Sequence, residues 1–244
     1  MKRILAVLIL LGYVSAMPAC AESGFALIEL FTSESCSSCP AADALLLELS
    51  EAADAQGVPL YTLGFHVDYW NYLSWVDEYS KSEYSQRQRD YARKIKGSSV
   101  YTPQMIVNGV HQFGGYRRDL ARRFIDQEMA KAAGLPLEIS VTHHNGTSEV
   151  RVKLEEPYAR TQINAALVES GLGNQVKSGE NAGRSLRHAH VVRDFQSVPV
   201  SVREHVLTLR YPPGSIKENC RVIVYLQDQD TYSVKAAGQI GLTL

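Results

Sequence analysis

The chain has 244 residues, of which 45% are hydrophobic, and its formal net charge is −1. This length and apolar content suffice for one large or two moderate hydrophobic cores. The near-zero charge excludes a general electrostatic attraction to nucleic acid or to an anionic membrane, and a total of four cysteines excludes a disulfide-rich scaffold. No nucleotide, flavin or haem motif is recognisable, so we expect no cofactor and no nucleic-acid partner.

The chain opens with the features of a secretory signal peptide. Two basic residues precede the apolar run Ile4–Val14, and small residues follow it. The run is too short for a permanent membrane anchor. Cleavage after Ala21 predicts a signal peptide over residues 1–21 and a periplasmic or secreted protein. Cleavage after Ala19 would instead leave Cys20 as the first residue, and only a lipid attached there would bring the protein to a membrane.

Two cysteines lie between a predicted strand and a predicted helix. The apolar run Phe25–Phe31 is typical of a strand covered on both faces, and apolar residues recur at helical spacing from Ala41 to Leu49. Cys36 and Cys39 therefore lie at a helix start, where unpaired N–H groups favour a thiolate. Cys36 is the expected nucleophile, and Cys39 lies within reach to close a disulfide. Without a second C-x-x-C a four-thiolate zinc site is excluded; a mixed site would need distant histidines, so redox chemistry is favoured.

A second strand, Pro59–Phe65, follows the helix and leads into an aromatic loop. A right-handed crossover brings the ends of both strands to one side of the sheet, so this loop should lie near the thiols. Tyr69 and Trp70 could line a groove for an extended polypeptide, or could pack the loop as a satellite core. His66 and Asp68 could transfer protons to Cys39, or could be hydrogen-bonded without a catalytic role.

The next predicted elements are a basic helix over Ser82–Lys96, a hairpin and a second amphipathic helix. The strands Met105–Val107 and Val110–Phe113 flank an Asn-Gly turn, and Pro103 opens the first of them, where a cis bond would make the turn. The helix predicted over Arg117–Ala133 ends at a glycine.

The order of these elements over about Phe25–Ala133 resembles the thioredoxin fold. The motifs IELFTSESCSSCPAADALL, HVDYWNYLSW and SVYTPQMIVNG are similar to an uncharacterised bacterial family of secreted thioredoxin-like proteins, filed as a domain of unknown function. The resemblance implies a redox pair, a cis-proline facing it, a residue whose backbone pairs with a bound polypeptide, and a buried acid that assists proton transfer. The matching residues are Cys36 and Cys39, Pro103, Thr102 and Glu29, respectively.

From Leu135 the pattern changes to short strands without a helix signal, which predicts a β-sandwich. His188 and His190 would share one strand face, but no third ligand is evident, so we expect no metal site. Cys220 begins an apolar strand and is expected to be an inert buried thiol; a bridge to Cys20 has no support from spacing. The predicted strands are Leu137–Thr142, Glu149–Leu154, Gln162–Glu169, Arg187–Arg193, Glu204–Arg210, Arg221–Gln227 and Ser233–Gly238.

The sequence therefore predicts an α/β thioredoxin-like domain over residues 22–134, followed by a β-sandwich domain over residues 135–244. The expected function is an exported thiol–disulfide oxidoreductase that acts on protein or peptide thiols through Cys36 and Cys39, with Thr102, Pro103 and the aromatic loop holding the partner chain. The alternative is a non-catalytic binding module in which the same two cysteines form a permanent structural disulfide.

Overall fold

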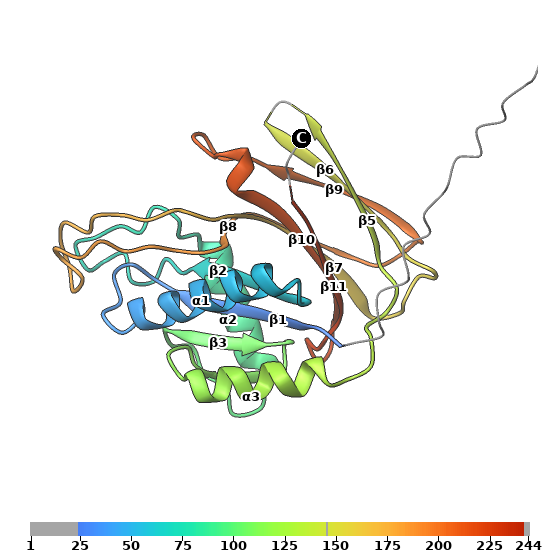
Figure 1. Cartoon of the computed structure of the whole chain (residues 1–244), viewed down its shortest axis with the longest axis horizontal. Coiled ribbons are helices and arrows are strands. Elements are labelled where there is room, and N and C mark those ends of the chain that lie inside the picture. The colour runs from blue at the N-terminus through green and yellow to red at the C-terminus, as the bar shows by residue number, and fades with distance from the viewer. Residues whose placement is uncertain (1–23, 145, 242–244) are drawn as a thin grey trace, which may run out of the picture.

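The computed structural model describes residues 24–144 and 146–241 of the chain (Figure 1). Within these ranges there are three α-helices, eleven strands and one short 3₁₀ helix, Lys217–Asn219. The signal peptide expected over residues 1–21 lies outside the described residues, as does Cys20. The helices are α1 (Pro40–Gln56), α2 (Ser82–Lys94) and α3 (Arg118–Met129), and the strands are β1 (Ala26–Thr32), β2 (Leu60–His66), β3 (Gln104–Val107), β4 (His111–Gly114), β5 (Glu138–His144), β6 (Thr147–Lys153), β7 (Thr161–Glu169), β8 (Val191–Pro199), β9 (Glu204–Arg210), β10 (Cys220–Asp228) and β11 (Val234–Gly241).

One mixed sheet of eight strands runs through the molecule in the order β11-β10-β7-β8-β2-β1-β3-β4. Strand β1 is parallel to β2, and β2 is parallel to β8, whereas the other neighbouring strands are antiparallel. The remaining strands form a second, smaller sheet in the order β5-β6-β9. Strands from both halves of the chain therefore share the large sheet.

The predicted fold class, an α/β thioredoxin-like fold followed by a β-sandwich, is wrong. Strand β8 pairs with β2 at Gly64 and Val191, and the Gly64 amide donates to the carbonyl of His190 at 2.8 Å, so the C-terminal strands extend the N-terminal sheet. The prediction failed because periodicity identifies strands one at a time and does not determine which strands pair.

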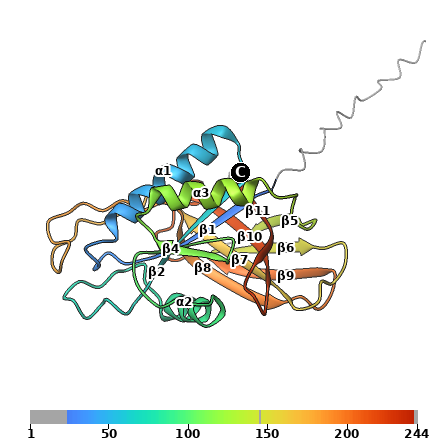
Figure 2. The ribbon, with the colours of Figure 1, turned by 90° about the horizontal axis from the view of Figure 1, so that it is seen from below.

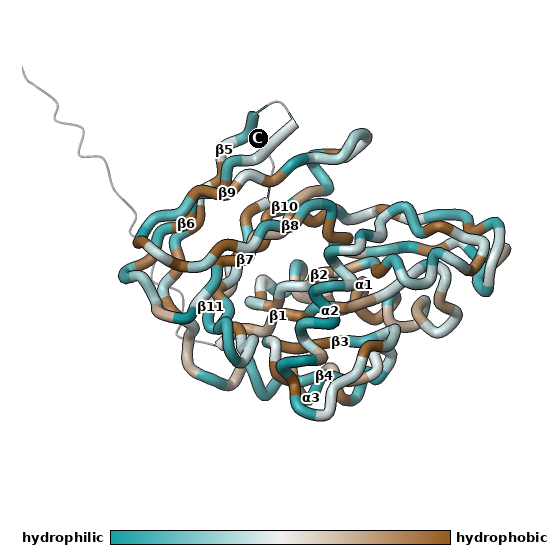
Figure 3. Tube along the Cα trace, turned by 180° about the vertical axis from the view of Figure 1, so that it is seen from behind, coloured by the Kyte–Doolittle hydropathy of each residue, from teal (hydrophilic) through white to brown (hydrophobic). Residues whose placement is uncertain are grey.

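Hydrophobic cores fill both faces of the large sheet. On one face, alternate residues of β1 pack beneath α1 and α3, and farther along the sheet β7 and β10 pack against the small sheet. On the other face, Leu27 and Phe31 of β1 pack with Tyr84 and Tyr91 of α2. Figure 2 shows α1 and α3 on the side opposite α2. Figure 3 shows α2 as a mostly hydrophilic helix, so its few apolar side chains form its contact with the sheet.

Helix α1 has a defined beginning and end. Cys39 is its N-cap residue and Pro40 its first residue, where a missing N–H costs no hydrogen bond. Gly57 ends the helix in the left-handed conformation with φ of 63°, and its amide donates to the carbonyl of Ala53. The cysteine pair is thereby held at the helix N-terminus. No helix in the described ranges is long and apolar enough to cross a membrane.

Three loops lie together at one end of the large sheet (Figure 1). They are the turn after β1, the aromatic loop after β2, and the residues 172–188 before β8, which we call the capping hairpin. Bridges between Leu172 and His188 and between Gln175 and Ser185 hold the two arms of that hairpin together. Segments far apart in the sequence thus meet where the cysteines lie.

Candidate functional site

Both cysteines are free thiols within a tight turn at the start of α1. The Cys39 amide donates to the carbonyl of Cys36 at 3.1 Å, and the amides of Ala42 and Asp43 donate to the carbonyl of Cys39. The side chains are buried, with 3% of Cys36 and none of Cys39 exposed. Because the turn fixes both backbones, the two sulfurs are kept within hydrogen-bond reach of each other.

The surroundings shift the pKa values of the two thiols in opposite directions. A hydrogen bond from Cys39 is the main cause that lowers the pKa of Cys36 to about 6; burial opposes it, and smaller contributions from Ser38 and Thr102 add to the lowering. Burial is the main cause that raises the pKa of Cys39, and its bond to Cys36 and the charge of Asp43 add to this. At neutral pH the pair therefore carries one thiolate, on Cys36, and one protonated thiol, on Cys39.

The predicted substrate-binding residues lie beside the thiols. The Thr102–Pro103 peptide bond is cis, and the side chain of Thr102 reaches Cys36 by a hydrogen bond. The indole Nε1 of Trp70 donates to Thr102 Oγ1 at 2.7 Å. Tyr69 contacts the Trp70 ring and donates from its hydroxyl to Gln88. The aromatic loop is therefore attached to the residues that flank Cys36.

Asp43 of α1 lies beneath Cys39 and was missed as a site residue in the sequence. Its Oδ2 accepts a hydrogen bond from Thr32 Oγ1 at 3.1 Å, and burial raises the pKa of its carboxyl group. Asp43 follows Cys39 by one helical turn, so both face the same side of α1. That i, i+4 spacing was the available signal.

A buried cluster of imidazole and carboxylate groups extends from Asp43. His188 Nε2 lies 3.0 Å from Glu34 Oε1, and His66 Nδ1 lies 2.7 Å from Asp77 Oδ2. The two imidazole rings are 4.7 Å apart, edge to face. Burial alone would lower the pKa of His66, but the Asp77 carboxylate outweighs it, so the pKa is raised. The structure therefore places His66, a candidate from the sequence, in this cluster, close enough for its charge to act on Asp43.

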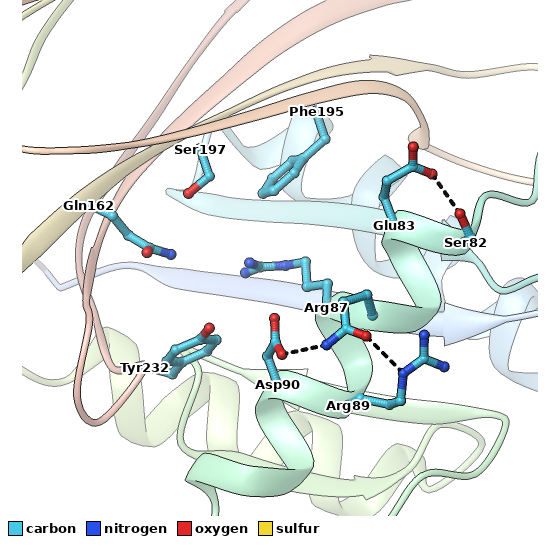
Figure 4. Close-up of a pocket in the computed structure, with 10 residues that line it drawn as sticks. Ser82, Glu83, Arg87, Arg89, Asp90, Gln162, Phe195, Ser197 and Tyr232 are labelled. Atoms are coloured by element: carbon cyan, nitrogen blue, oxygen red, sulfur yellow. Dashed lines mark hydrogen bonds between the residues drawn. The ribbon is translucent and has the colours of Figure 1, made fainter.

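The other two proton-transfer candidates have different partners. Glu29 lies on the sheet face that packs against α2, where its carboxylate accepts from Arg87 Nε at 2.6 Å and from Nη2 at 2.8 Å. Figure 4 shows the Arg87 guanidinium in a cleft of about 540 Å³ between α2 and the C-terminal strands, and neither cysteine lines it. Asp68 accepts a hydrogen bond from Ser85. Within residues 24–144 and 146–241, neither Glu29 nor Asp68 is hydrogen-bonded to a cysteine.

The remaining histidine and cysteine candidates are separated from one another. His190 has a different partner from His188 and binds Thr62 Oγ1 at 2.6 Å, and burial lowers its pKa to about 4. Among residues 24–144 and 146–241, no group of three or more His, Cys, Asp or Glu side chains is arranged to hold a metal ion. Burial raises the pKa of Cys220 to about 12. Its proposed bridge partner, Cys20, lies outside the described residues.

The capping hairpin covers the cysteine turn, a contact that no local sequence pattern predicts. Asn181 Nδ2 donates to the carbonyl of Glu34 at 2.8 Å and to that of Cys36 at 2.9 Å. The Ser37 amide donates to Glu180 Oε2 at 3.0 Å. These contacts hold the capping hairpin against the backbone of the cysteine turn, where Cys36 is buried.

Comparison with known proteins gives a family and two similar structures. A family model described as "Protein of unknown function (DUF1223)" matches residues 27–227. Protein AGR_C_4864 from Agrobacterium tumefaciens is 27% identical, with 88% of this chain and 93% of that chain covered and a TM-score of 0.63. HBP35 of Porphyromonas gingivalis shares the fold at 14% identity, with 91% and 76% covered and a TM-score of 0.61. A comparison with curated proteins found no match.

Proposed function

The chain belongs to the family of proteins of unknown function DUF1223, and for this member we propose an exported thiol–disulfide oxidoreductase that acts on protein or peptide thiols through Cys36 and Cys39. The observation that carries the proposal is the opposite shift of the two thiol pKa values, with Cys36 lowered to about 6 and Cys39 raised. An attacking thiolate and a protonated resolving thiol are the two states that stepwise disulfide exchange requires.

The reaction proceeds by two displacements. The Cys36 thiolate attacks one sulfur of a substrate disulfide, the substrate S–S bond breaks, and the first substrate thiolate leaves. Cys39 then loses its proton and attacks Cys36 Sγ, which releases the second substrate thiolate and forms the Cys36–Cys39 disulfide. Two electrons pass from the dithiol to the substrate, and the reverse sequence oxidises a substrate dithiol.

Asp43 is the proposed acceptor of the Cys39 proton. Its charge acts directly on Cys39, and burial makes its ionised carboxylate more basic than an exposed one. This role replaces the one that the sequence suggested for Glu29, whose carboxylate is bound by Arg87 on the other face of the sheet.

Thr102, Pro103, Tyr69 and Trp70 are the proposed binding residues for the partner chain. We assign this role to them because of where they lie: Thr102 contacts Cys36 and binds Trp70. An extended peptide that displaced the capping hairpin would lie along the backbone of Thr102, beside Pro103. Export remains a proposal that rests on the basic and apolar pattern of residues 1–21.

The test is the reduction potential of the Cys36–Cys39 pair in the mature chain, equilibrated against glutathione buffers with trapping of the free thiols. We expect a reversible midpoint between about −120 and −270 mV, the range of exchange enzymes. A disulfide that stays closed below about −300 mV would be structural. That result would reject the oxidoreductase and favour a binding module with a permanent disulfide.

A further inference from the structure

His188 has one ring nitrogen that the structure leaves without a hydrogen bond. The side chain is 3% exposed, and its Nε2 lies 3.0 Å from Glu34 Oε1. Its Nδ1 is buried and has no hydrogen-bond partner among the described residues, and lies 3.9 Å from Asp43 Oδ1. Buried polar atoms are nearly always bonded, so an unpaired nitrogen beside a carboxyl group needs an explanation.

The contact between His188 and Glu34 bears on where the protons of His188 and Asp43 lie. When Nε2 carries the hydrogen and donates to Glu34, Nδ1 carries a lone pair. Burial raises the pKa of the Asp43 carboxyl group, so a proton that this group accepts from Cys39 could pass on to Nδ1, 3.9 Å away. The resulting imidazolium would be stabilised by the Glu34 carboxylate, which also accepts from Trp75 and Asn174. Asp43 would then be ionised and ready to accept the proton of Cys39.

Two small cavities lead from this pair to the surface between α1 and the segment 185–190. One of about 200 Å³ is lined by His188, and the other of about 250 Å³ is lined by Asp43. Leu47 and Arg187 contribute to the walls of both. These volumes admit water, and neither Thr102 nor Pro103 lines them.

Other titratable groups also face His188. The His66 ring packs against it, and so does Tyr79 at a ring distance of 5.8 Å. Asp77 binds His66 from the far side and raises the pKa of that imidazole. The two neighbouring imidazoles therefore each have a carboxylate partner of their own, Asp77 for His66 and Glu34 for His188.

We propose that His188 relays the proton between the Cys39–Asp43 pair and solvent, through the cavities behind α1. Protons would then leave on one side of the helix while the substrate occupies the other. His188 acts through Asp43 and has no contact with the reacting sulfur. The proposal rests on the proposed exchange reaction of Cys36 and Cys39.

The test uses the mature chain and 5,5′-dithiobis(2-nitrobenzoate), whose coloured thiol product is released twice. Attack by Cys36 gives the first release, and attack by Cys39 on the mixed disulfide gives the second. We expect His188→Asn to leave the first rate unchanged and to slow the second about tenfold or more, with a changed pH profile. Glu34→Gln, which retains the imidazole, should slow the second release as well. Added imidazole should partly restore the second release in His188→Ala.

His190→Asn is the matched control, because His190 lines the same cavity and binds Thr62. It should leave both rates near those of the wild type. Equal slowing of both releases by His188→Asn and His188→Gln, or an unchanged second rate at every pH, would overturn the relay. Failure of the wild-type protein to give a second release would instead count against the exchange reaction itself.

Discussion

Replacing Cys39 by alanine should raise the pKa of Cys36. The hydrogen bond from Cys39 is the largest of the causes that lower this pKa from 9.0 to about 6. Each pH unit corresponds to about 1.4 kcal/mol, so the surroundings favour the Cys36 thiolate by about 4 kcal/mol in total. The bonds from Ser38 and Thr102 remain in the variant, so part of the stabilisation is retained. We therefore expect a rise of about one to two pH units.

Cys39→Ser is the matched control, because its hydroxyl keeps a donor at the same position. The assay is a pH titration of the thiolate ultraviolet absorbance in both variants, each of which has Cys36 as its one thiol in the turn. The serine variant should titrate close to the wild-type value. An alanine variant that also titrates near pH 6 would refute the reasoning, since the helix N-terminus and Thr102 would then suffice.

Three other perturbations have defined outcomes. Arg87→Met leaves Glu29 buried without its bidentate partner, so urea unfolding should show a loss of about 3–5 kcal/mol that is partly recovered in the double variant with Glu29→Gln. Folding raises the pKa of His66, so the contribution of this residue to stability is complete below about pH 6.5 and is lost as the pH rises through the folded pKa. The free energy of unfolding, measured across this pH range, should therefore decrease with rising pH. His66→Gln should make this decrease smaller. Asn181→Ala removes two of the bonds between the capping hairpin and the cysteine turn, so alkylation of Cys36 should become several times faster, and an unchanged rate would show that these bonds do not limit access.

Local features of the fold could be predicted from the sequence, whereas pairing between distant segments could not. Apolar runs and helical spacing located β1, α1 and β2, and the Thr-Pro pair located the cis bond. The fold class was wrong because nothing in the pattern of Arg187–Arg193 indicates that a strand there joins β2. Strand pairing depends on which edge is left open after folding.

The candidate site likewise combines residues that a local pattern identifies with residues that are distant in the sequence. Cys36 and Cys39 have a recognisable spacing. The sheet face on which Glu29 lies follows from the alternation of side chains along β1, in which Leu27 and Phe31 face α2. Glu29 therefore faces α2 with them. The pairing of His188 with Glu34 joins positions 154 residues apart, which no local pattern reveals.

The capping hairpin also affects the order in which the molecule can be assembled. It reaches the cysteine turn through contacts such as that between Glu180 and Ser37, which are 143 residues apart in the chain. Contacts of such long sequence separation form slowly, because closing the intervening loop costs entropy before any bond is gained. The cysteine turn and α1 can form early from local contacts, but Cys36 stays uncovered until the chain beyond residue 181 has docked. A growing or truncated chain that ends before the hairpin therefore exposes its reactive thiol to oxidation and to mixed disulfides with other chains.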